Sequence, residues 1–334
     1  MLTLKIGTRD SVLAKWQTQW VVNELKRFWP DIDCQIIAIK TTGDKILDVS
    51  LSKIGDKGLF TKELEVYLQK GQIDLAVHSL KDLPTQLPEG CALGAICQRA
   101  EPGDVLISQK GETLKELPTG SRVGTSSLRR KAQLLNYRPD LQIEDLRGNV
   151  LTRLKKLEQQ GLDAIILAAA GIERLGLGAK ITEYLAYDVC LPAVGQGAIA
   201  LEVRGADPEV QRLITPLHDA ASAAATLAER SLLRRLEGGC QIPIAALARI
   251  QNQELILKAR VASEDGLRMV QATRSIAWPI NTEPRDNGQI DQPGVSAKWS
   301  WPYQPLVEQL GRDLAEELLA QGAKEILQCL GRMN

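Results

Sequence analysis

Three short turns combine glycine, serine or asparagine with arginine at places where a strand is expected to end and a helix to begin. They are Gly7-Thr8-Arg9-Asp10-Ser11, the run 124–130 (GTSSLRR), and Arg147-Gly148-Asn149 leading to Arg153. Such turns present free backbone N–H groups and the positive end of a helix dipole, and guanidinium groups add charge-assisted donors. One turn of this kind is often ordinary helix capping beside solvated charge, but three in one chain favour a site for carboxylates or phosphates.

A second candidate for chemistry is His78-Ser79-Leu80-Lys81-Asp82, which follows the apolar run IDLAV. Catalytic groups in α/β sheets commonly lie at strand ends, so Asp82 is the candidate acid or base. A Lys-Asp pair after a strand is also a common surface turn, and the spacing alone leaves both interpretations open. His78 alternates in phase with Asp74 and Ala76, which favours a structural histidine over a catalytic one.

Two loops could add to such a centre. The segment 53–65 (KIGDKGLFTKELE) places two glycines and two lysines before a helix, which would suit either a mobile lid over an anion or a simple turn. Gly238-Gly239-Cys240 differs, because two glycines expose the next side chain and the cysteine lies outside any apolar run. The sequence chemistry leaves a reactive thiol and an ordinary loop cysteine equally open there.

Composition limits the partners. With 334 residues, 44% of them hydrophobic and 25% charged, the chain is expected to form two or three globular units. The 41 basic and 41 acidic residues balance, which argues against nucleic-acid and membrane-surface partners. No stretch approaches the ~20 apolar residues of a membrane helix, so we expect a cytoplasmic protein, or one of the plastid stroma if a transit peptide was removed. Six cysteines without CxxC or histidine partners predict no metal site and no disulfide framework, and Cys34 and Cys97 should pack in strands.

The elements that would position these residues alternate between two periodicities. The runs LKIG, CQIIAI, IDLAV, DVLI, DAIILAA and AIALEV have strand length and alternate with helical patterns, which indicates α/β units with buried, mainly parallel strands. Residues 11–28 predict a helix that ends before Pro30. Its apolar stripe would consist of Leu13, Trp16, Trp20, Val21, Leu25 and Phe28.

Internal similarity divides the chain. Residues 6–17 are echoed by 123–133, and 71–83 by 161–175, which suggests two similar α/β lobes with a ligand site where their strand ends face each other. A third, α+β domain should follow, with an Ala-rich helix over 220–237 and alternating strands over 244–278. Residues 279–305 hold five of the fifteen prolines and predict a long loop or insertion, and 306–330 return to helical spacing.

Taken in order, GTRDS, HSLKDLP, VGTSSLRR, LRGNV, LPAVGQGA and GGCQIP resemble the motifs of the porphobilinogen deaminases. The resemblance covers nearly the whole chain outside 279–305. It implies an α/β fold with two lobes similar to those of periplasmic binding proteins, with mixed, mainly parallel sheets, plus a smaller C-terminal α+β domain. The expected boundaries are 1–98 with 198–217 for the first lobe, 99–197 for the second, and 218–334 for the C-terminal domain with its insertion.

The resemblance also implies a reaction. A transferase of this family joins four porphobilinogen molecules head to tail, releases ammonia each time and hydrolyses off the linear tetrapyrrole hydroxymethylbilane. Cys240 would hold a dipyrromethane cofactor through a thioether, and Asp82 would stabilise an azafulvenium cation and assist proton transfer. We expect a monomer.

The acetate and propionate groups of each pyrrole would need fixed cationic partners. The residues implied to hold the cofactor are Cys240, Lys81, Asp82, Ser127, Arg129, Arg130 and Arg147. Those implied to bind substrate are Arg9, Ser11, Lys53, Lys57, Phe60, Arg153 and Arg174. The division between cofactor and substrate stays open, because the chain of pyrroles must shift through the site as it grows.

Other classes of protein share some of these features. A two-lobed receptor for a small anion would use the same arginines, but would need no cysteine displayed after two glycines. A phosphate-handling α/β enzyme is disfavoured because neither GxxxxGK[ST] nor GxGxxG occurs. Residues 122–156 carry nine basic and three acidic residues, but Tyr137 is the only aromatic side chain there for base stacking, which disfavours nucleic-acid binding.

Overall fold

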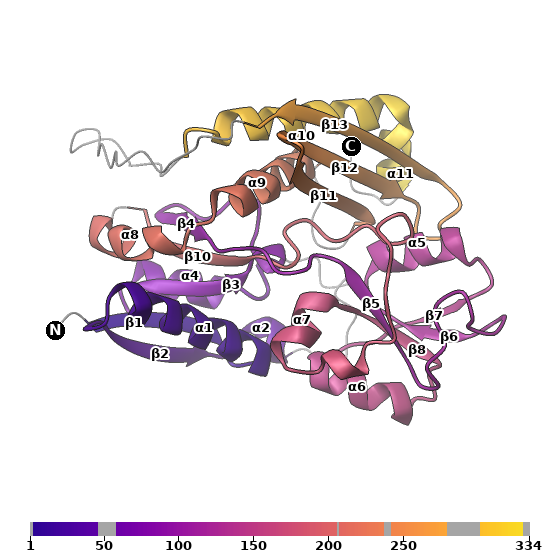
Figure 1. The fold of residues 1–334 in the computed structure, drawn as a ribbon, viewed down its shortest axis with the longest axis horizontal. Helices are drawn as coiled ribbons and strands as arrows, with labels where there is room; N and C mark the ends of the chain where they lie inside the picture. Colours follow the sequence, from indigo (N-terminus) through magenta and orange to yellow (C-terminus); the bar gives the residue numbers. More distant parts are fainter. Residues whose placement is uncertain (1–2, 46–57, 206, 237–241, 279–300, 330–334) are drawn as a thin grey trace.

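The computed structural model describes residues 3–45, 58–205, 207–236, 242–278 and 301–329, which form three sheets with packed helices (Figure 1). In Figure 1 the first sheet lies at the left, the second at the right and the third above them. Their strand orders are β2-β1-β3-β10-β4, β7-β6-β8-β5-β9 and β11-β12-β13. We call the first two sheets with their helices the first and second lobes, and the third the C-terminal domain.

The strands and helices have the following bounds. The first sheet contains β1 (Thr3–Arg9), β2 (Asp33–Ile39), β3 (Leu75–Ser79), β4 (Cys91–Ile96) and β10 (Ile199–Arg204). The second contains β5 (Asp104–Ser108), β6 (Arg122–Gly124), β7 (Gln142–Glu144), β8 (Ala164–Ala168) and β9 (Glu183–Tyr184), and the third β11 (Ile244–Gln251), β12 (Glu254–Ala262) and β13 (Met269–Ala277). The helices are α1 (Val12–Phe28), α2 (Thr42–Lys45), α4 (Lys62–Gln69), α5 (Leu128–Tyr137), α6 (Val150–Gln159), α7 (Ala169–Arg174), α8 (Pro208–Ile214), α9 (Ala220–Arg235), α10 (Gln304–Leu318) and α11 (Lys324–Cys329). Shorter helical turns are η1 (Leu80–Asp82), η2 (Gly178–Lys180), η3 (Thr215–Leu217) and η4 (Leu319–Ala323).

The first two sheets are built alike. In each, the first three strands of the order pair in parallel, and the fourth runs antiparallel to both its neighbours. β1 and β6 therefore hold equivalent positions, and so do β3 and β8, which are the strands within the two sequence echoes. The prediction of two similar α/β lobes with mixed sheets is confirmed.

The central strands of both lobes are mostly apolar because both faces of each sheet are covered. On the first sheet, α1 and α8 pack on one face and α4 on the other. In the second, alternate residues of β8 enter two separate cores, with Ala164 and Ile166 in one and Ile165 and Leu167 in the other. Most of the apolar runs therefore mark central strands buried on both faces; the exception is CQIIAI, which forms the partly exposed edge strand β2.

The predicted stripe of α1 is only partly right. Val21 and Leu25 are buried as expected, but Trp16 is 37% exposed and Phe28 49% exposed. The buried face instead consists of Ala14, Gln17, Thr18, Val21, Val22 and Leu25. The helix thus packs through a narrower face, and Trp16 lies on the flank that looks toward the second lobe.

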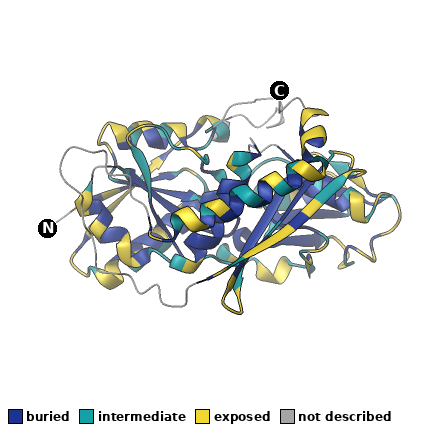
Figure 2. Ribbon diagram, turned by 90° about the horizontal axis from the view of Figure 1, so that it is seen from above, coloured by how far each residue is buried: buried dark blue, intermediate teal, exposed yellow. Residues whose placement is uncertain are grey.

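The C-terminal domain closes over α9, whose residues 222–232 are all buried. Small side chains let α10 approach closely, since a Cβ at Gly311 would lie 2.3 Å from the carbonyl oxygen of Ala228. Along α10 buried and exposed residues alternate in helical spacing, and β11 and β12 of the sheet that it covers are mostly buried, whereas β13 is mostly exposed (Figure 2). The close packing of α9 against α10 explains why residues 220–237 are rich in alanine.

The predicted 279–305 insertion lies largely outside the described residues. Its last two residues, 304 and 305, belong to α10, which begins two residues earlier than expected. Proline is tolerated in the first turn of a helix because its missing N–H would have no helical partner there. Trp301 and Tyr303, just before the helix, are buried against the core. No helix of the described chain is long and apolar enough to span a bilayer.

Two crossover segments connect the lobes, and one buried carboxylate ties them together. Glu229 of α9 is fully buried and accepts bidentate hydrogen bonds from Arg99 of the first crossover, at 2.7 and 3.1 Å. It also accepts from the backbone N–H of Gly195 in the second crossover at 2.7 Å, and from that of Ala248 in β11 at 2.8 Å. Glu229 therefore joins both crossovers to the C-terminal domain.

Glu229→Gln should lower the free energy of unfolding by about 3–5 kcal/mol, because it leaves the buried Arg99 charge uncompensated. The matched control is Glu316→Gln, which breaks the exposed pair with Arg235 (Nε–Oε1 2.6 Å) and should cost less than about 1 kcal/mol. Urea titrations of both variants check this. Equal losses would contradict the role assigned to Glu229.

Candidate active site

The parallel strands β1 and β3 are neighbours, so their carboxyl ends bring predicted site residues together. Nη1 of Arg9, the last residue of β1, lies 3.7 Å from Oδ2 of Asp82, in the turn η1 directly after β3. The Arg9 guanidinium lies over the ring of Phe60, 4.1 Å from its centre. A Cβ at Gly43 would lie 2.2 Å from the Phe60 ring, so only glycine allows this close approach.

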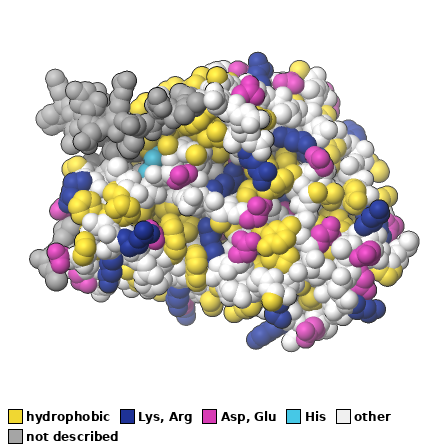
Figure 3. Space-filling model, viewed as in Figure 1, with side chains coloured by type: hydrophobic (Ala, Val, Ile, Leu, Met, Phe, Trp, Pro, Cys, Tyr) yellow, Lys and Arg dark blue, Asp and Glu magenta, His cyan; other side chains and the backbone are white. Residues whose placement is uncertain are grey.

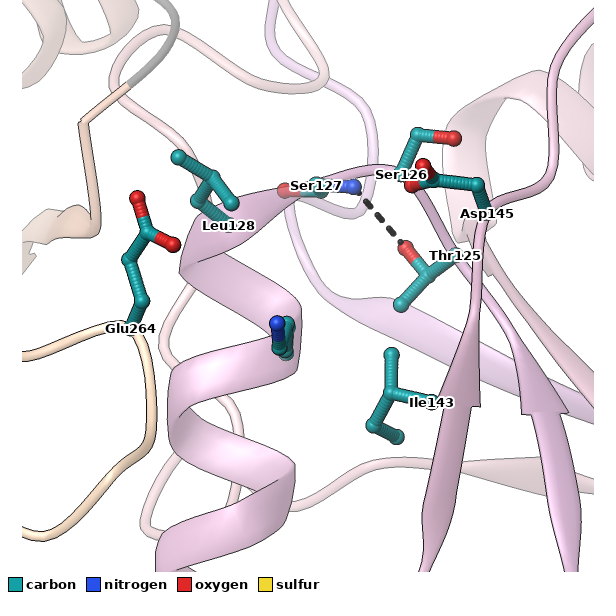
Figure 4. Close-up of a pocket in the computed structure, with 8 residues that line it drawn as sticks. Thr125, Ser126, Ser127, Leu128, Ile143, Asp145 and Glu264 are labelled. Carbon is teal, nitrogen blue, oxygen red and sulfur yellow. Dashed lines mark hydrogen bonds between the residues drawn. The ribbon is translucent and has the colours of Figure 1, made fainter. Parts of the chain in front are cut away.

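The second lobe presents the turn between β6 and α5. Ser127 is the N-cap of α5, where its hydroxyl accepts from the backbone N–H of Arg130, and its own N–H donates to Oγ1 of Thr125. A pocket of about 260 Å³ lies beside this turn. It is lined by Thr125, Ser126, Ser127, Leu128, Lys131, Ile143, Asp145 and Glu264 (Figure 4). Figure 4 shows Asp145 beside Ser126, and Glu264 reaching the helix start from the loop between β12 and β13.

Arg129 and Arg130 hold a protein carboxylate between them. Oδ2 of Asp104 lies 2.8 Å from Nη1 of Arg129, and Oδ1 lies 2.6 Å from Nη2 of Arg130. Burial alone would raise the pKa of Asp104, but the charges and hydrogen bonds of the two guanidinium groups hold it well below its usual range. Arg129 also donates to the carbonyl of Leu191 at 2.6 Å, and Arg130 to that of Ile166 at 2.9 Å. That these arginines also bind ligand carboxylates stays a prediction.

Further cations lie close by, and no ion pair with an acid is formed by Arg147 or Arg153 among the residues that the structure describes. Burial, together with the charges of Arg130 and Arg147, lowers the pKa of Arg153 to about 10, while Asp82 acts in the opposite direction. Nη1 of Arg147 is buried and has no hydrogen-bond partner among the described residues, and the same holds for Nε of Arg130. Such a cluster is ready to bind an anion with several carboxylates, which fits a dipyrromethane with its acetate and propionate groups.

Lys81 is influenced by charged groups of both lobes. Burial lowers the pKa of Lys81 to about 8, with Asp82 and Asp104 raising it and Arg130 and Arg129 lowering it. Its Nζ lies 3.4 Å from Oε1 of Gln196 in the second crossover. The charge of Asp82 in the first lobe therefore acts on Lys81, and so do the charges of Asp104 and its two arginines in the second lobe, which we call the Asp104 cluster.

Two predicted substrate residues lie at the contact between the lobes. Ser11 is the N-cap of α1 and accepts from the backbone N–H of Ala14. Arg174 donates to the carbonyl of Gly197 at 2.7 Å and lies 5.9 Å from the centre of the Trp16 ring. Burial lowers the pKa of Arg174. Arg174 thus links α7 to α1 and to the second crossover.

Three predicted site residues, Lys53, Lys57 and Cys240, lie outside the described residues. His78 is buried with its Nε2 2.8 Å from Oε2 of the buried Glu202, as a structural histidine would be. Sequence reasoning missed Asp104 and Gln196. The sequence did contain a signal for Asp104, because an acidic residue at the start of a buried apolar run requires an internal partner.

The visible face agrees with this distribution of charge. Figure 3 shows Lys and Arg side chains gathered near its middle, where the lobes and the C-terminal domain meet, with single Asp and Glu side chains among them. In the described part of the chain, no group of three or more His, Cys, Asp or Glu residues could hold a metal ion.

Comparisons with known proteins identify the family. The family model described as porphobilinogen deaminase, dipyromethane cofactor binding domain, matches residues 4–212, and that of the porphobilinogen deaminase C-terminal domain matches 223–290. A porphobilinogen deaminase of Moorella thermoacetica is 52% identical over 328 residues, covering 98% of this chain and 96% of the relative. One of Desulforamulus reducens is 52% identical over 325 residues, covering 97% of each.

Among solved structures, a probable amino-acid ABC transporter extracellular-binding protein of Bacillus subtilis aligns at 13% identity, with a TM-score of 0.41 over 70% of this chain and 97% of that one. The substrate-binding domain of a putative molybdenum ABC transporter of Clostridium difficile aligns at 10% identity with the same TM-score, over 66% of this chain and 94% of that one. The family models and the full-length relatives all name one family, whereas the structural alignments at 10–13% identity do not identify a family. On that evidence the chain belongs to the porphobilinogen deaminase family.

Proposed function

We propose that Asp82, in the turn η1 directly after β3, is the catalytic residue of this porphobilinogen deaminase. The enzyme condenses four porphobilinogen molecules head to tail, releases ammonia at each condensation and finally releases hydroxymethylbilane by hydrolysis. The observation that carries the assignment is the place of Asp82, a carboxylate 3.7 Å from Arg9, next in sequence to Lys81 and close enough to oppose the repulsion at Arg153.

Charge distinguishes Asp82 from the basic side chains around it as the group that can stabilise a cation. When ammonia leaves the aminomethyl group of porphobilinogen, the pyrrole is left as an azafulvenium cation. The arginine and lysine groups around it cannot stabilise a cation, whereas the Asp82 carboxylate can, and it can accept pyrrole N–H hydrogen bonds and help to move a proton. Arg9 would hold the carboxylate in place for this task.

The basic side chains between the two lobes, with Asp82 and Ser127 beside them, would hold the cofactor. The side chains that we assign to it are Lys81, Asp82, Ser127, Arg129, Arg130 and Arg147, with Cys240 as the covalent attachment point. When bound, the dipyrromethane would supply the terminal pyrrole to which the first unit is joined, and each later unit would be joined to the pyrrole added before it. The unpartnered Nη1 of Arg147 and Nε of Arg130 support this assignment, because both are donors that the described protein leaves unused.

Substrate carboxylates would meet a second set. We assign Arg9, Ser11, Lys53, Lys57, Phe60, Arg153 and Arg174 to it. Phe60 differs from the others, since its ring already stacks on the Arg9 guanidinium and offers an apolar wall for a pyrrole.

The strand order supports domain boundaries at 98, 197 and 217, because β10 returns to the first sheet after the second lobe is complete. We also propose that the protein acts as a monomer in the cytoplasm, with no nucleic-acid or membrane partner. The balance of 41 basic and 41 acidic residues supports the absence of nucleic-acid and membrane-surface partners.

Intact mass spectrometry of the purified protein should show two linked pyrrole units added to the mass of the chain. Cys240→Ser should lose the addition, because the thiolate that forms the thioether is gone. Cys329→Ser, at an exposed cysteine of α11, is the control and should keep it. An unmodified Cys240 in active protein would refute the attachment.

Arg147→Met should raise the free energy of unfolding of cofactor-free protein by about 1 kcal/mol, because it removes a buried, unpartnered donor. Urea titrations in a Cys240→Ser background measure this. Arg138→Met is the control, since Arg138 is bound to Asp140 and to the carbonyls of Leu114 and Leu117, and it should lose about 1–3 kcal/mol. With Cys240 present, Arg147→Met should reduce the fraction of protein that carries the added mass. A stability loss at Arg147 like that at Arg138 would make it a structural residue.

Asp82→Asn keeps shape and hydrogen bonding but removes the charge. Loss of ~3–4 kcal/mol of cation stabilisation corresponds to a fall in turnover of a few hundredfold or more. Ammonia release and bilane formation are measured on protein whose cofactor has been verified by mass. Asp82→Glu should retain part of the activity, and Asp188→Asn, at the exposed pair with Lys258, should retain all of it. If Asp82→Asn that carries the cofactor turns over within tenfold of the enzyme without the substitution, the cation is stabilised elsewhere.

A further inference from the structure

The side chain of Gln196 lies between the two lobes and is only 1% exposed. Its Nε2 donates to the carbonyl of Pro102 at 2.7 Å, to that of Gly103 at 3.2 Å and to Oδ1 of Asp104 at 2.9 Å. Its Oε1 accepts from Nζ of Lys81 at 3.4 Å. One amide thus contacts the start of the second lobe on one side and the first lobe on the other.

These partners allow only one orientation of the amide. The nitrogen faces three acceptors, so a flipped amide would place its oxygen against three oxygens and its NH₂ against an ammonium group. The orientation is therefore set by hydrogen bonding, and Oε1 must face Lys81.

The backbone around Gln196 holds the amide in place. Its carbonyl accepts from Nε of Arg99 at 2.8 Å, and Arg99 is paired with the buried Glu229. Gly195 and Gly197 on either side have φ values of 71° and 91°, which glycine adopts without strain. A Cβ at Gly197 would lie 2.6 Å from the carbonyl oxygen of Ala100, so the two crossovers touch here.

We propose that Gln196 is a positioning residue, which holds the Lys81 ammonium beside Asp82 and couples it to the Asp104 cluster of the second lobe. The inference rests on the proposed function in so far as Lys81 contacts the cofactor. Gln196 itself touches no reacting atom, and it acts through Lys81.

The charge around Lys81 gives the proposal a measurable sign. The charged groups that act on Lys81 are Asp82, Asp104, Arg129 and Arg130, and burial lowers its pKa to about 8. An acceptor that faces an ammonium group favours its protonated form, so removal of Oε1 should lower the pKa of Lys81 further. Lys81 would then lose its proton at lower pH than in the unmodified enzyme.

The test compares the unmodified holoenzyme with Gln196→Met, which removes the amide at similar volume. Gln211→Met is the matched control, because Gln211 is also a buried glutamine whose Nε2 donates to a backbone carbonyl, that of Gly94, at 2.9 Å. Lysine labelled with ¹³C at Cε reports the Lys81 titration by NMR, with the signal assigned from a Lys81→Arg spectrum. The pH dependence of kcat and KM for bilane formation, and cofactor occupancy by intact mass, are measured on the same samples.

Gln196→Met should move the Lys81 titration, and the alkaline limb of kcat, to lower pH by about one unit. It should lower kcat only about twofold at pH 7 but nearly tenfold at about pH 9, because a one-unit shift changes the protonated fraction of Lys81 most above its pKa. KM should change less than threefold, and Gln211→Met should change none of these. Gln196→Glu keeps an acceptor toward Lys81, so its titration should not move to lower pH, and this second variant covers the case that Gln196→Met does not fold.

An unchanged Lys81 titration in Gln196→Met, or in Gln196→Glu a titration at lower pH, overturns the inference. So does a loss of kcat that is equally large when Gln196→Met is made in a Lys81→Met background. The NMR titration is independent of turnover. An unmodified protein that makes no bilane while Gln196→Met still shifts Lys81 would therefore sink the proposed function and leave the coupling intact.

Discussion

The carboxylate of Asp104, buried between the guanidinium groups of Arg129 and Arg130, is the interaction on which the second lobe's half of the site depends. Two cations in a low-dielectric interior would repel each other strongly without it. With it, the first turn of α5 can hold two arginines at fixed positions before any ligand is bound. The same carboxylate accepts from Gln196, so the pairing extends from the second lobe to the second crossover.

A second buried carboxylate does for the crossovers what Asp104 does for α5. Glu229 binds Arg99 and the N–H of Gly195, and its helix α9 lies in the core of the C-terminal domain. The two connections between the lobes are therefore not free linkers, because both are bound to a third body. Any change in the angle between the lobes must be accommodated by these hydrogen bonds or by the glycines beside them.

The charge that remains unpaired is as informative as the charge that is paired. Arg147 and Arg153 lie near Arg130 with no acid among the described residues to match them, apart from the charge of Asp82 felt at Arg153. A protein selected for stability alone would not keep such a cluster, because buried donors without partners and like charges both cost free energy. The cost is understandable in an enzyme whose cofactor, substrate and product are all polycarboxylates, and in our proposal Asp82 is the one acid among these residues that would stabilise a cation.

Much of the fold could be predicted because local rules decide it. Burial on both faces gave the central strands their apolar runs. Ser11, Ser127 and Asn149 each cap the helix that follows, and the echoes at 6–17 and 123–133 lie at the equivalent strands β1 and β6. The family motifs pointed to the reaction and to the cations. The stripe of α1 was only partly right, because helical spacing does not say which neighbours will cover a flank, and Trp16 and Phe28 stayed largely exposed.

The sequence by itself thus determined the elements, the repeat and the identity of the charged residues, since these depend on periodicity, capping and residue type. Only the tertiary structure decided which charges meet. Asp104 and Arg130 are 26 residues apart, and Lys81 and Gln196 are 115 residues apart. Both pairs arise because strands far apart in the chain end at the same place, where the crossovers join the lobes. Pairing across such distances depends on how whole sheets pack, and no local pattern in the chain carries that information.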